Sequence, residues 1–145
     1  MQLIVKKFDE LTVTELYDIL KLRAAVFILE QNCLYQDLDE KDKHAYHVYL
    51  TDNNNIQAYA RVLDIGVSYA DATSIGRIIS AERGKGLGSQ IVKASIQVAK
   101  DKYGPNKIKI AAQSYAKVFY EKEGFVVCSD EFLEDGIPHV EMVLG

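Results

Sequence analysis

A glycine-rich hexapeptide, Arg83–Gly88, most constrains what this chain can fold into. It follows a run typical of a β-strand, Ile75–Ser80, and it opens a helix whose apolar residues recur on one face from Leu87 onward. Glycines let successive backbone N–H groups turn toward one point, and a helix N-terminus adds the positive end of its dipole. Arg83 and Lys85 add charge. The sequence therefore predicts a cradle for a phosphate or pyrophosphate group.

The spacing of the glycines excludes two common nucleotide-binding loops. A dinucleotide-binding fold requires G-x-G-x-x-G, whereas Gly84, Gly86 and Gly88 recur at every second residue. A mononucleotide P-loop requires Gly-Lys-Ser/Thr after four intervening residues, and this chain lacks that order too. Gly-Lys-Gly runs also occur in ordinary surface turns, so the hexapeptide alone leaves a structural turn as the alternative.

Two motifs together point to a known family. Written as R-x-x-G-x-G, Arg83–Gly88 resembles the Gln/Arg-x-x-Gly-x-Gly/Ala loop of the GNAT superfamily. The segment Ala116–Phe125 is similar to the other hallmark of that superfamily, a short helix ending at Gly-Phe, with Tyr120 four residues before the glycine. Their order and separation favour this resemblance over a structural turn. It implies transfer of an acyl group from acyl-coenzyme A (acyl-CoA), usually to an amine.

Bulk composition limits the remaining function classes. The chain has 145 residues, of which 48% are hydrophobic and 26% charged, which predicts a single domain over residues 1–145 with its own core. A formal net charge of −4 argues against nucleic-acid binding, and no apolar run is long enough to span a membrane. Cys33 and Cys128 lie far apart, and residues 1–8 do not resemble a secretion signal. These features favour a cytoplasmic protein with reduced thiols.

Hydrophobic periodicity predicts an α/β (α+β) fold with a central mixed, mostly antiparallel sheet and helices on both faces. Thr12 and Glu15 form a capping box before a helix, the stretch 30–43 is a polar connection that has room for a second short helix, and Ser114 is predicted to cap a short helix ending at Gly124. The helix that opens at Leu87 ends at residues 103–105. The predicted strands span residues 3–8, 47–50, 56–63, 73–80, 107–112, 126–128 and 139–144. This order is that of the GNAT fold across essentially the whole chain.

The resemblance also implies roles for residues of the cofactor side. Tyr120 would protonate the leaving thiolate, whereas helical spacing alone would make it a packing residue. A backbone N–H at Ile78 or Ile79 would stabilise the oxyanion, and Gln113 stands where many members carry an asparagine that bonds the pantetheine. The expected acetyl-CoA contacts are Ile78, Ile79, Ser80, Arg83, Gly84, Lys85, Gly86, Leu87, Gly88, Ser89, Gln113 and Tyr120. Only three residues separate Ile79 from Arg83, which leaves the identity of the oxyanion amide open.

Polar segments outside the cofactor motifs resemble the ElaA-like branch of GNAT proteins. They run from Leu22 to Asp37 and from Asp135 to His139, and they would border the acceptor side. Candidate general bases are Glu30, His47 and His139, with a hydrogen-bonded structural role as the favoured alternative for each. For Arg23, a side chain that reaches solvent from the edge of the apolar stripe is favoured over a ligand role. Cys33 is expected to pack, and Asp37, Asp39 and Asp42 lack the remaining ligands of a calcium loop, so no metal is expected.

The sequence therefore favours an N-acetyltransferase that moves an acetyl group from acetyl-CoA to a primary amine of a small molecule or a protein, by direct attack on the thioester. The alternatives are a catalytically silent acetyl-CoA-binding sensor and an interaction module. Acidic residues, including Glu30, Asp37 and Asp39, are expected near the amine entrance, which favours a cationic acceptor. A homodimer is left open.

Overall fold

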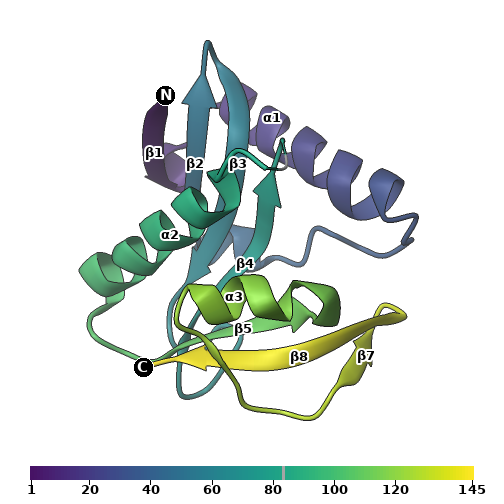
Figure 1. Cartoon of the computed structure of the whole chain (residues 1–145). Helices are drawn as coiled ribbons and strands as arrows, with labels where there is room; N and C mark the ends of the chain where they lie inside the picture. Colours follow the sequence, from purple (N-terminus) through teal and green to yellow (C-terminus); the bar gives the residue numbers. More distant parts are fainter. Residues whose placement is uncertain (83) are drawn as a thin grey trace.

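The structure is a computed structural model that describes residues 1–82 and 84–145. Its strands form one mixed sheet in the order β1-β2-β3-β4-β5-β8-β6, and β7 pairs with the N-terminal end of β8 (Figure 1). All neighbouring strands are antiparallel except β4 and β5, which run parallel. The strands are β1 (Gln2–Lys7), β2 (Tyr46–Asp52), β3 (Asn55–Leu63), β4 (Thr73–Ser80), β5 (Ile108–Gln113), β6 (Val126–Val127), β7 (Phe132–Glu134) and β8 (Ile137–Leu144).

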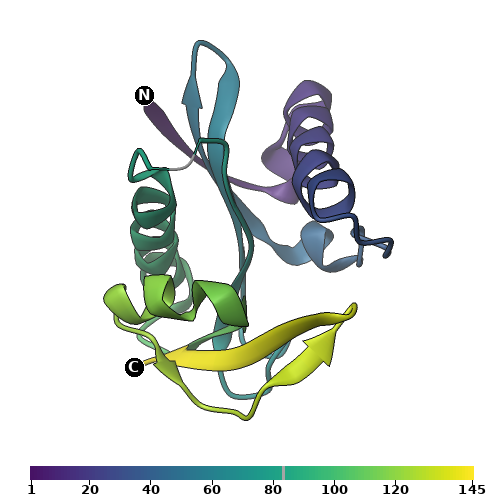
Figure 2. The same ribbon diagram turned by 45° about the vertical axis from the view of Figure 1, so that its right-hand side comes forward.

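Helices cover both faces of this sheet, as the hydrophobic pattern predicts. Helix α1 lies on one face, and α2 and α3 lie on the other (Figure 2). The α-helices are α1 (Val13–Arg23), α2 (Leu87–Tyr103) and α3 (Lys117–Lys122). Shorter elements are the 3₁₀ turns η1 (Phe8–Glu10), η3 (Lys41–His44) and η4 (Ser114–Ala116) and the π-helix η2 (Ala24–Glu30). In the described part of the chain, no helix combines the length and apolar character that a membrane span requires.

Strand alternation divides the buried residues between two layers. Val48, Ala60 and Val62 point toward α2 and join its buried residues in the larger cluster. Tyr49 and Tyr59, their neighbours along the strands, point the other way and pack with Ile19 of α1. Because both faces are covered, β2 and β3 are buried along most of their length.

Local signals explain several element boundaries. The Thr12 hydroxyl accepts the Glu15 N–H at 3.0 Å, and the Glu15 carboxylate accepts the Thr12 N–H at 2.8 Å, which confirms the predicted capping box. The β2–β3 hairpin turns through Asn53 and Asn54, both at positive φ, as its asparagine run predicts. Gly104 ends α2 at a φ of 90°.

Three predictions about elements are wrong. Ser114 caps no helix; its hydroxyl instead donates to Glu131 at 2.8 Å, and Ala116 precedes α3 without a side-chain cap. The strand β7, which the prediction omitted, forms a hairpin with β8 through Asp135 and Gly136, both at positive φ. The predicted first helix changes at Ala24 into the wider π-helix η2.

The sheet splits between β4 and β5, and this split creates the space for a site. Within the described chain, ladder pairing joins these strands only at Thr73 with Ile108 and at Ser74 with Lys109. On the other edge of β4, two residues, Arg77 and Ile78, oppose the single residue Ala60 of β3. Such a bulge bends a strand, and Arg77 adopts a φ of 52° within it. The bent β4 thus diverges from β5 beyond Ser74.

Candidate active site

A cavity of 1810 Å³ lies where β4 and β5 diverge. One part is lined by the second half of β4, the start of α2 and one side of α3. The other part is lined by the end of η2, the connection that follows it, and the β7–β8 hairpin. Predicted site residues in this lining are Glu30, Ile78, Ile79, Ser80, Gly84, Gly86, Leu87, Gly88, Ser89, Gln113, Tyr120 and His139. The fold therefore gathers residues from most of the chain around one space.

The glycine turn presents the N-terminus of α2 to this cavity. Gly84 and Gly86 have φ values of 80° and 73°, which residues with a Cβ rarely adopt. Gly86 precedes the helix, and its carbonyl accepts the Gln90 N–H at 3.1 Å. The N–H groups of the first helical turn have no partner within a helix, so they are available to an anion. A Cβ at Gly88 would come within 3.3 Å of the Phe119 ring, so glycine also permits α2 to approach α3 closely.

The predicted cations of this region differ in their placement. Arg83 lies outside the described residues. Lys85 is exposed, pairs with Glu82 at 2.5 Å, and is not among the lining residues. Arg77 of β4, another cation near the glycine turn in sequence, donates to Asp37 at 2.7 Å. The charge of Arg77 is therefore paired with aspartates and is not free to bind a phosphate.

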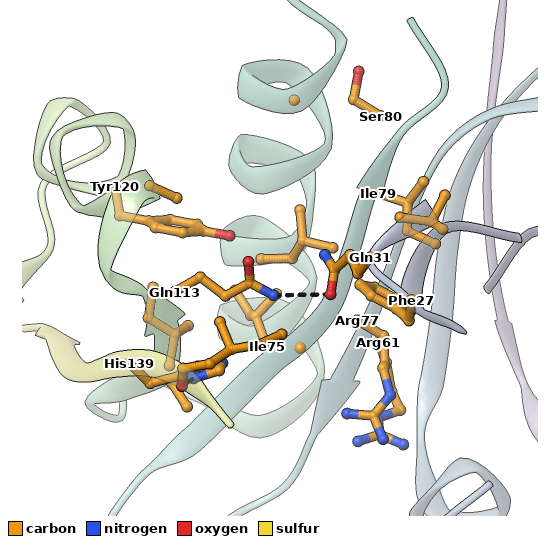
Figure 3. A pocket seen from close by; sticks show the side chains of 18 of the residues that line it. Phe27, Gln31, Arg61, Ile75, Arg77, Ile79, Ser80, Gln113, Tyr120 and His139 are labelled. Atoms are coloured by element: carbon orange, nitrogen blue, oxygen red, sulfur yellow. Dashed lines mark hydrogen bonds between the residues drawn. The ribbon is translucent and has the colours of Figure 1, made fainter. Parts of the chain in front are cut away.

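Tyr120 lies on α3, and its hydroxyl points into the cavity (Figure 3). The ring packs edge-on against Phe119 and Phe125, with centroids 5.0 and 6.2 Å away. Burial, with a smaller contribution from Tyr115, raises the pKa of the Tyr120 hydroxyl. The phenol therefore stays protonated at neutral pH and can serve as a proton donor.

Gln113 ends β5 and faces Gln31 across the cavity (Figure 3). Its side-chain amide donates to the Gln31 Oε1 atom at 3.2 Å. The family resemblance implies a cofactor-side role for Gln113 and none for Gln31. Only its membership of the polar segment after Glu30 indicated that it borders the acceptor side.

His139 and Glu30 both line the part of the cavity next to η2 and the β7–β8 hairpin, which the sequence predicted to be the acceptor side. The His139 Nδ1–H donates to the Ile137 carbonyl at 2.7 Å, since a carbonyl can only accept, and this bond directs Nε2 toward Glu134 at 3.5 Å. The Phe132 ring stacks on the imidazole with centroids 6.0 Å apart. His139 is thereby held in one orientation, whereas Glu30 is exposed at the end of η2. The sequence does not indicate that Glu134 is a partner of His139, because the two residues meet through the β7–β8 pairing, and β7 was not predicted.

His47 does not reach the cavity. It is fully buried on β2 beneath α1 and η3. Its Nε2–H donates to the Asp42 carbonyl at 2.9 Å, and its Nδ1 accepts the Tyr59 hydroxyl at 2.7 Å. Burial lowers its pKa, so it remains neutral. His47 is thus a structural histidine, which was the favoured alternative, and it does not reach the cavity where a base would act.

An arginine–aspartate cluster forms part of the cavity wall, where Asp39, Arg61 and Arg77 are lining residues. The prediction that Arg23 reaches solvent is wrong, because its side chain is fully buried and pairs with Asp37 at 2.9 Å and Asp42 at 2.6 Å. Arg61 pairs with Asp39 at 2.7 Å and with Asp42 at 3.1 Å. Burial alone would raise the pKa of Asp42, but the hydrogen bonds and charges of Arg23 and Arg61 lower it. The cluster comprises Arg23, Asp37, Asp39, Asp42, Arg61 and Arg77.

Comparisons with known proteins agree with this geometry. The model of the acetyltransferase (GNAT) domain matches residues 13–145. Among similar proteins, ElaA of Escherichia coli is 36% identical over 138 residues, covering 92% of this chain and 90% of ElaA. A UPF0039 protein of Schizosaccharomyces pombe is 38% identical over 148 residues, covering 99% of this chain and 97% of its own.

Solved structures show the same fold. The crystal structure of an acyl-CoA N-acyltransferase from Pseudomonas aeruginosa superposes with a TM-score of 0.93, at 33% identity over the whole of both chains. The crystal structure of E. coli ElaA gives a TM-score of 0.92, again over the whole of both chains. The predicted mixed sheet with helices on both faces is therefore confirmed, and the chain belongs to the GNAT family of acyl-CoA-dependent acyltransferases.

Proposed function

We propose that this protein transfers an acetyl group from acetyl-CoA to a primary amine of a small molecule or a protein, by direct attack of the amine on the thioester. The observation that carries the proposal is the split between β4 and β5. It opens one cavity that holds a helix N-terminus suited to phosphate, a protonated tyrosine and polar groups of a separate acceptor part.

The cofactor would lie along the β4 side of the split. The turn at Gly84–Ser89 suits the pyrophosphate, because the α2 N-terminus presents backbone N–H groups there. Gln113 has both a donor and an acceptor for the pantetheine amides. Ile78 lies in the β4 bulge, where it has no register partner on β3 in the described chain. Its backbone N–H is therefore our choice for the oxyanion donor.

The reaction needs a neutral amine, so a base must remove its proton before attack. His139 is favoured for this role because one backbone bond orients its ring and because its Nε2 atom, 3.5 Å from Glu134, is the nitrogen left to accept a proton; Glu30 remains the second candidate. The amine nitrogen then bonds to the acetyl carbon, and the carbon–sulfur bond breaks. Tyr120 gives its hydroxyl proton to the departing thiolate, the new amide nitrogen releases its surplus proton to solvent, and the Tyr120 oxygen regains a proton from solvent.

The acceptor part of the cavity favours a cationic amine. Glu30, Glu134 and Glu141 line it, together with Asp135. Arg61 and Arg77 reach the same lining and are offset by their ion pairs with Asp39 and Asp37. Asp37 and Asp39 are therefore not free to attract an amine, and the remaining carboxylates give the entrance its negative potential. Lys41 also lines the cavity, with its ammonium group bonded to the Ser68 hydroxyl at 2.9 Å, and is outnumbered by the four carboxylates. Polyamines, lysine side chains and basic N-termini fit this environment better than acidic amino acids.

Release of free CoA from acetyl-CoA, followed with a thiol reagent across a panel of amines and peptides, tests the proposal. We expect turnover with cationic acceptors and little with acidic ones. A catalytically silent sensor would bind CoA in a thermal-shift assay without releasing thiol for any acceptor. An interaction module would show neither signal.

A further inference from the structure

The bond between Gln31 and Gln113 crosses the cavity from one wall to the other. The two residues are 82 positions apart in sequence, and their side chains meet at 3.2 Å. We call this contact the glutamine bridge. In Figure 3 it runs between the β5 side and the η2 side, with Tyr120 and Ser80 on one side of it and His139 and Arg61 on the other. It therefore lies between the cofactor part and the acceptor part.

The backbone on the Gln31 side of the bridge is well anchored. The Gln31 N–H bonds the Val26 carbonyl at 3.3 Å, the five-residue spacing of a π-helix. Two residues later, the Cys33 N–H bonds the Ile28 carbonyl at 3.2 Å, and its thiol contacts the Asp135 carbonyl at 3.3 Å. The wide π-turn thus delivers Gln31 to a defined position, from which only its side chain needs to move.

The Gln113 side of the bridge is equally defined. Gln113 is the last residue of β5 and pairs in register with His139 of β8. Both residues line the cavity. The Gln113 amide nitrogen that meets Gln31 is the same kind of donor that a pantetheine carbonyl would need. The Gln113 NH2 group has two N–H donors, and the bridge occupies the one that points across the cavity. A pantetheine carbonyl that takes this N–H must therefore displace Gln31.

We propose that the glutamine bridge is a latch that competes with the cofactor for Gln113, and that Gln31 therefore weakens CoA binding in the free protein. This inference rests on the proposed function, since it assigns Gln113 to the pantetheine. Cofactor entry breaks the bridge and frees Gln31, whose oxygen then faces the acceptor part. The bridge thus couples occupation of the cofactor part to opening of the path between the two parts.

The competition gives an unusual expectation, because removal of a cavity side chain improves binding. A hydrogen bond of this kind contributes a modest net free energy, so Gln31→Ala is expected to lower the Kd for CoA by about two- to tenfold. Gln31→Glu keeps the acceptor atom and gives it charge, which strengthens the bond to Gln113. That variant is expected to raise the Kd for CoA.

Isothermal titration with CoA in a double-mutant cycle tests the latch. Both Gln31 substitutions are repeated in a Gln113→Ala background, where neither should change the Kd because the bridge is already lost. Gln57→Ala is the matched control, since Gln57 is a half-buried β3 glutamine outside the cavity lining whose side chain, among the described residues, bonds only the Asn55 carbonyl. It should leave the Kd unchanged.

The outcomes separate the latch from the function on which it rests. A Gln31→Ala variant with an unchanged or weaker affinity for CoA would overturn the latch, as would effects that persist in the Gln113→Ala background. Persistence would mean that Gln31 acts directly on the cofactor or through its charge. A wild-type protein without affinity for CoA would instead overturn the proposed function, and the latch with it.

Discussion

Burial acts in opposite directions on the two most informative titratable residues of this protein. It raises the pKa of Tyr120 and lowers that of His47, because desolvation disfavours the charged form of each. Both side chains are therefore neutral near pH 7. For Tyr120, which points into the cavity, neutrality means that a proton is available for a leaving group. For His47, whose two ring nitrogens are already bonded, it means a fixed place in the core.

The role of Tyr120 leads to a kinetic prediction. Tyr120→Phe removes only the hydroxyl and keeps the ring that packs against Phe119 and Phe125. We expect the Kd for CoA to stay the same and turnover to fall by about 10² to 10⁴, the usual contribution of a general acid. Thiol release measured at saturating acetyl-CoA checks this. Tyr115→Phe, on an exposed tyrosine of the same lining, is the control. Parental turnover in the Tyr120 variant would make Tyr120 a packing residue.

The environment of His47 leads to a prediction about stability. Because its pKa is lowered in the folded protein, the unfolded chain binds the proton more readily. The contribution of His47 to the free energy of unfolding is therefore fully present above the pKa of an unfolded histidine, about 6.5. Below that pH the free energy of unfolding falls, by at most about 1.4 kcal/mol per pH unit. Urea unfolding between about pH 8 and pH 5 measures this slope, above the range where carboxylates dominate.

Two histidine variants assign that slope. His44→Gln changes an exposed histidine and should retain the decline. His47→Gln should be less stable at every pH, since buried hydrogen bonds are lost, but its stability should no longer decline between about pH 6.5 and pH 5. An identical decline in both variants would assign the titration to another group.

At the scale of elements, the sequence predicted features that depend on local pattern and missed those that depend on distant contacts. The capping box, the turn through Asn53 and Asn54 and the alternation along β3 follow from neighbouring residues, and the structure has all of them. The change from α1 to the π-helix η2 leaves no mark in an apolar stripe, because both helices bury one face. The short strand β7 carries too few residues to alternate, although Asp135-Gly136 was a turn signal.

The same distinction applies to the candidate site. Family motifs led to the glycine turn, Gln113 and Tyr120, and the cavity gathers all three. The partners that orient other side chains, such as Glu134 beside His139 and Gln31 beside Gln113, come from segments far away in sequence. No spacing rule relates such residues, so only the fold reveals them.

The glycine turn leads to a prediction at this scale. Gly86→Val places a branched side chain at a φ of 73°, which costs about 1 to 2 kcal/mol of folding free energy. The surroundings of Gly86 are open, so the new side chain would occupy the space in front of the α2 N-terminus. We expect the thermal stabilisation by CoA to disappear. Gly66→Val, at a φ of 91° and also in open space, should carry a similar folding cost while retaining that stabilisation. A retained CoA shift in the Gly86 variant would contradict the phosphate cradle.

Because the sheet is split, contacts other than pairing with β5 must hold the β4 side of the molecule together. Beyond Ser74, β4 and β5 share no ladder pairs in the described chain. The arginine–aspartate cluster lies on the β4 side of the split and connects several elements there. Arg23 belongs to α1, Arg61 to β3 and Arg77 to the β4 bulge, while the three aspartates come from the connection that leads to β2. Asp37 also bonds Arg77 within the bulge, where the positive φ needs support.

This arrangement predicts that the loss of one aspartate destabilises the fold as a whole. Asp42 accepts hydrogen bonds from Arg23 at 2.6 Å and from Arg61 at 3.1 Å, and both arginines are buried. Asp42→Ala leaves two buried charges short of a partner, which costs about 3 to 5 kcal/mol in the free energy of unfolding. Glu40→Ala is the matched control, because Glu40 pairs with Lys43 in solvent and such pairs contribute little. Urea unfolding at neutral pH compares the two variants. Equal stability would mean that solvent reaches the cluster and that hydrophobic packing alone joins α1 to the sheet.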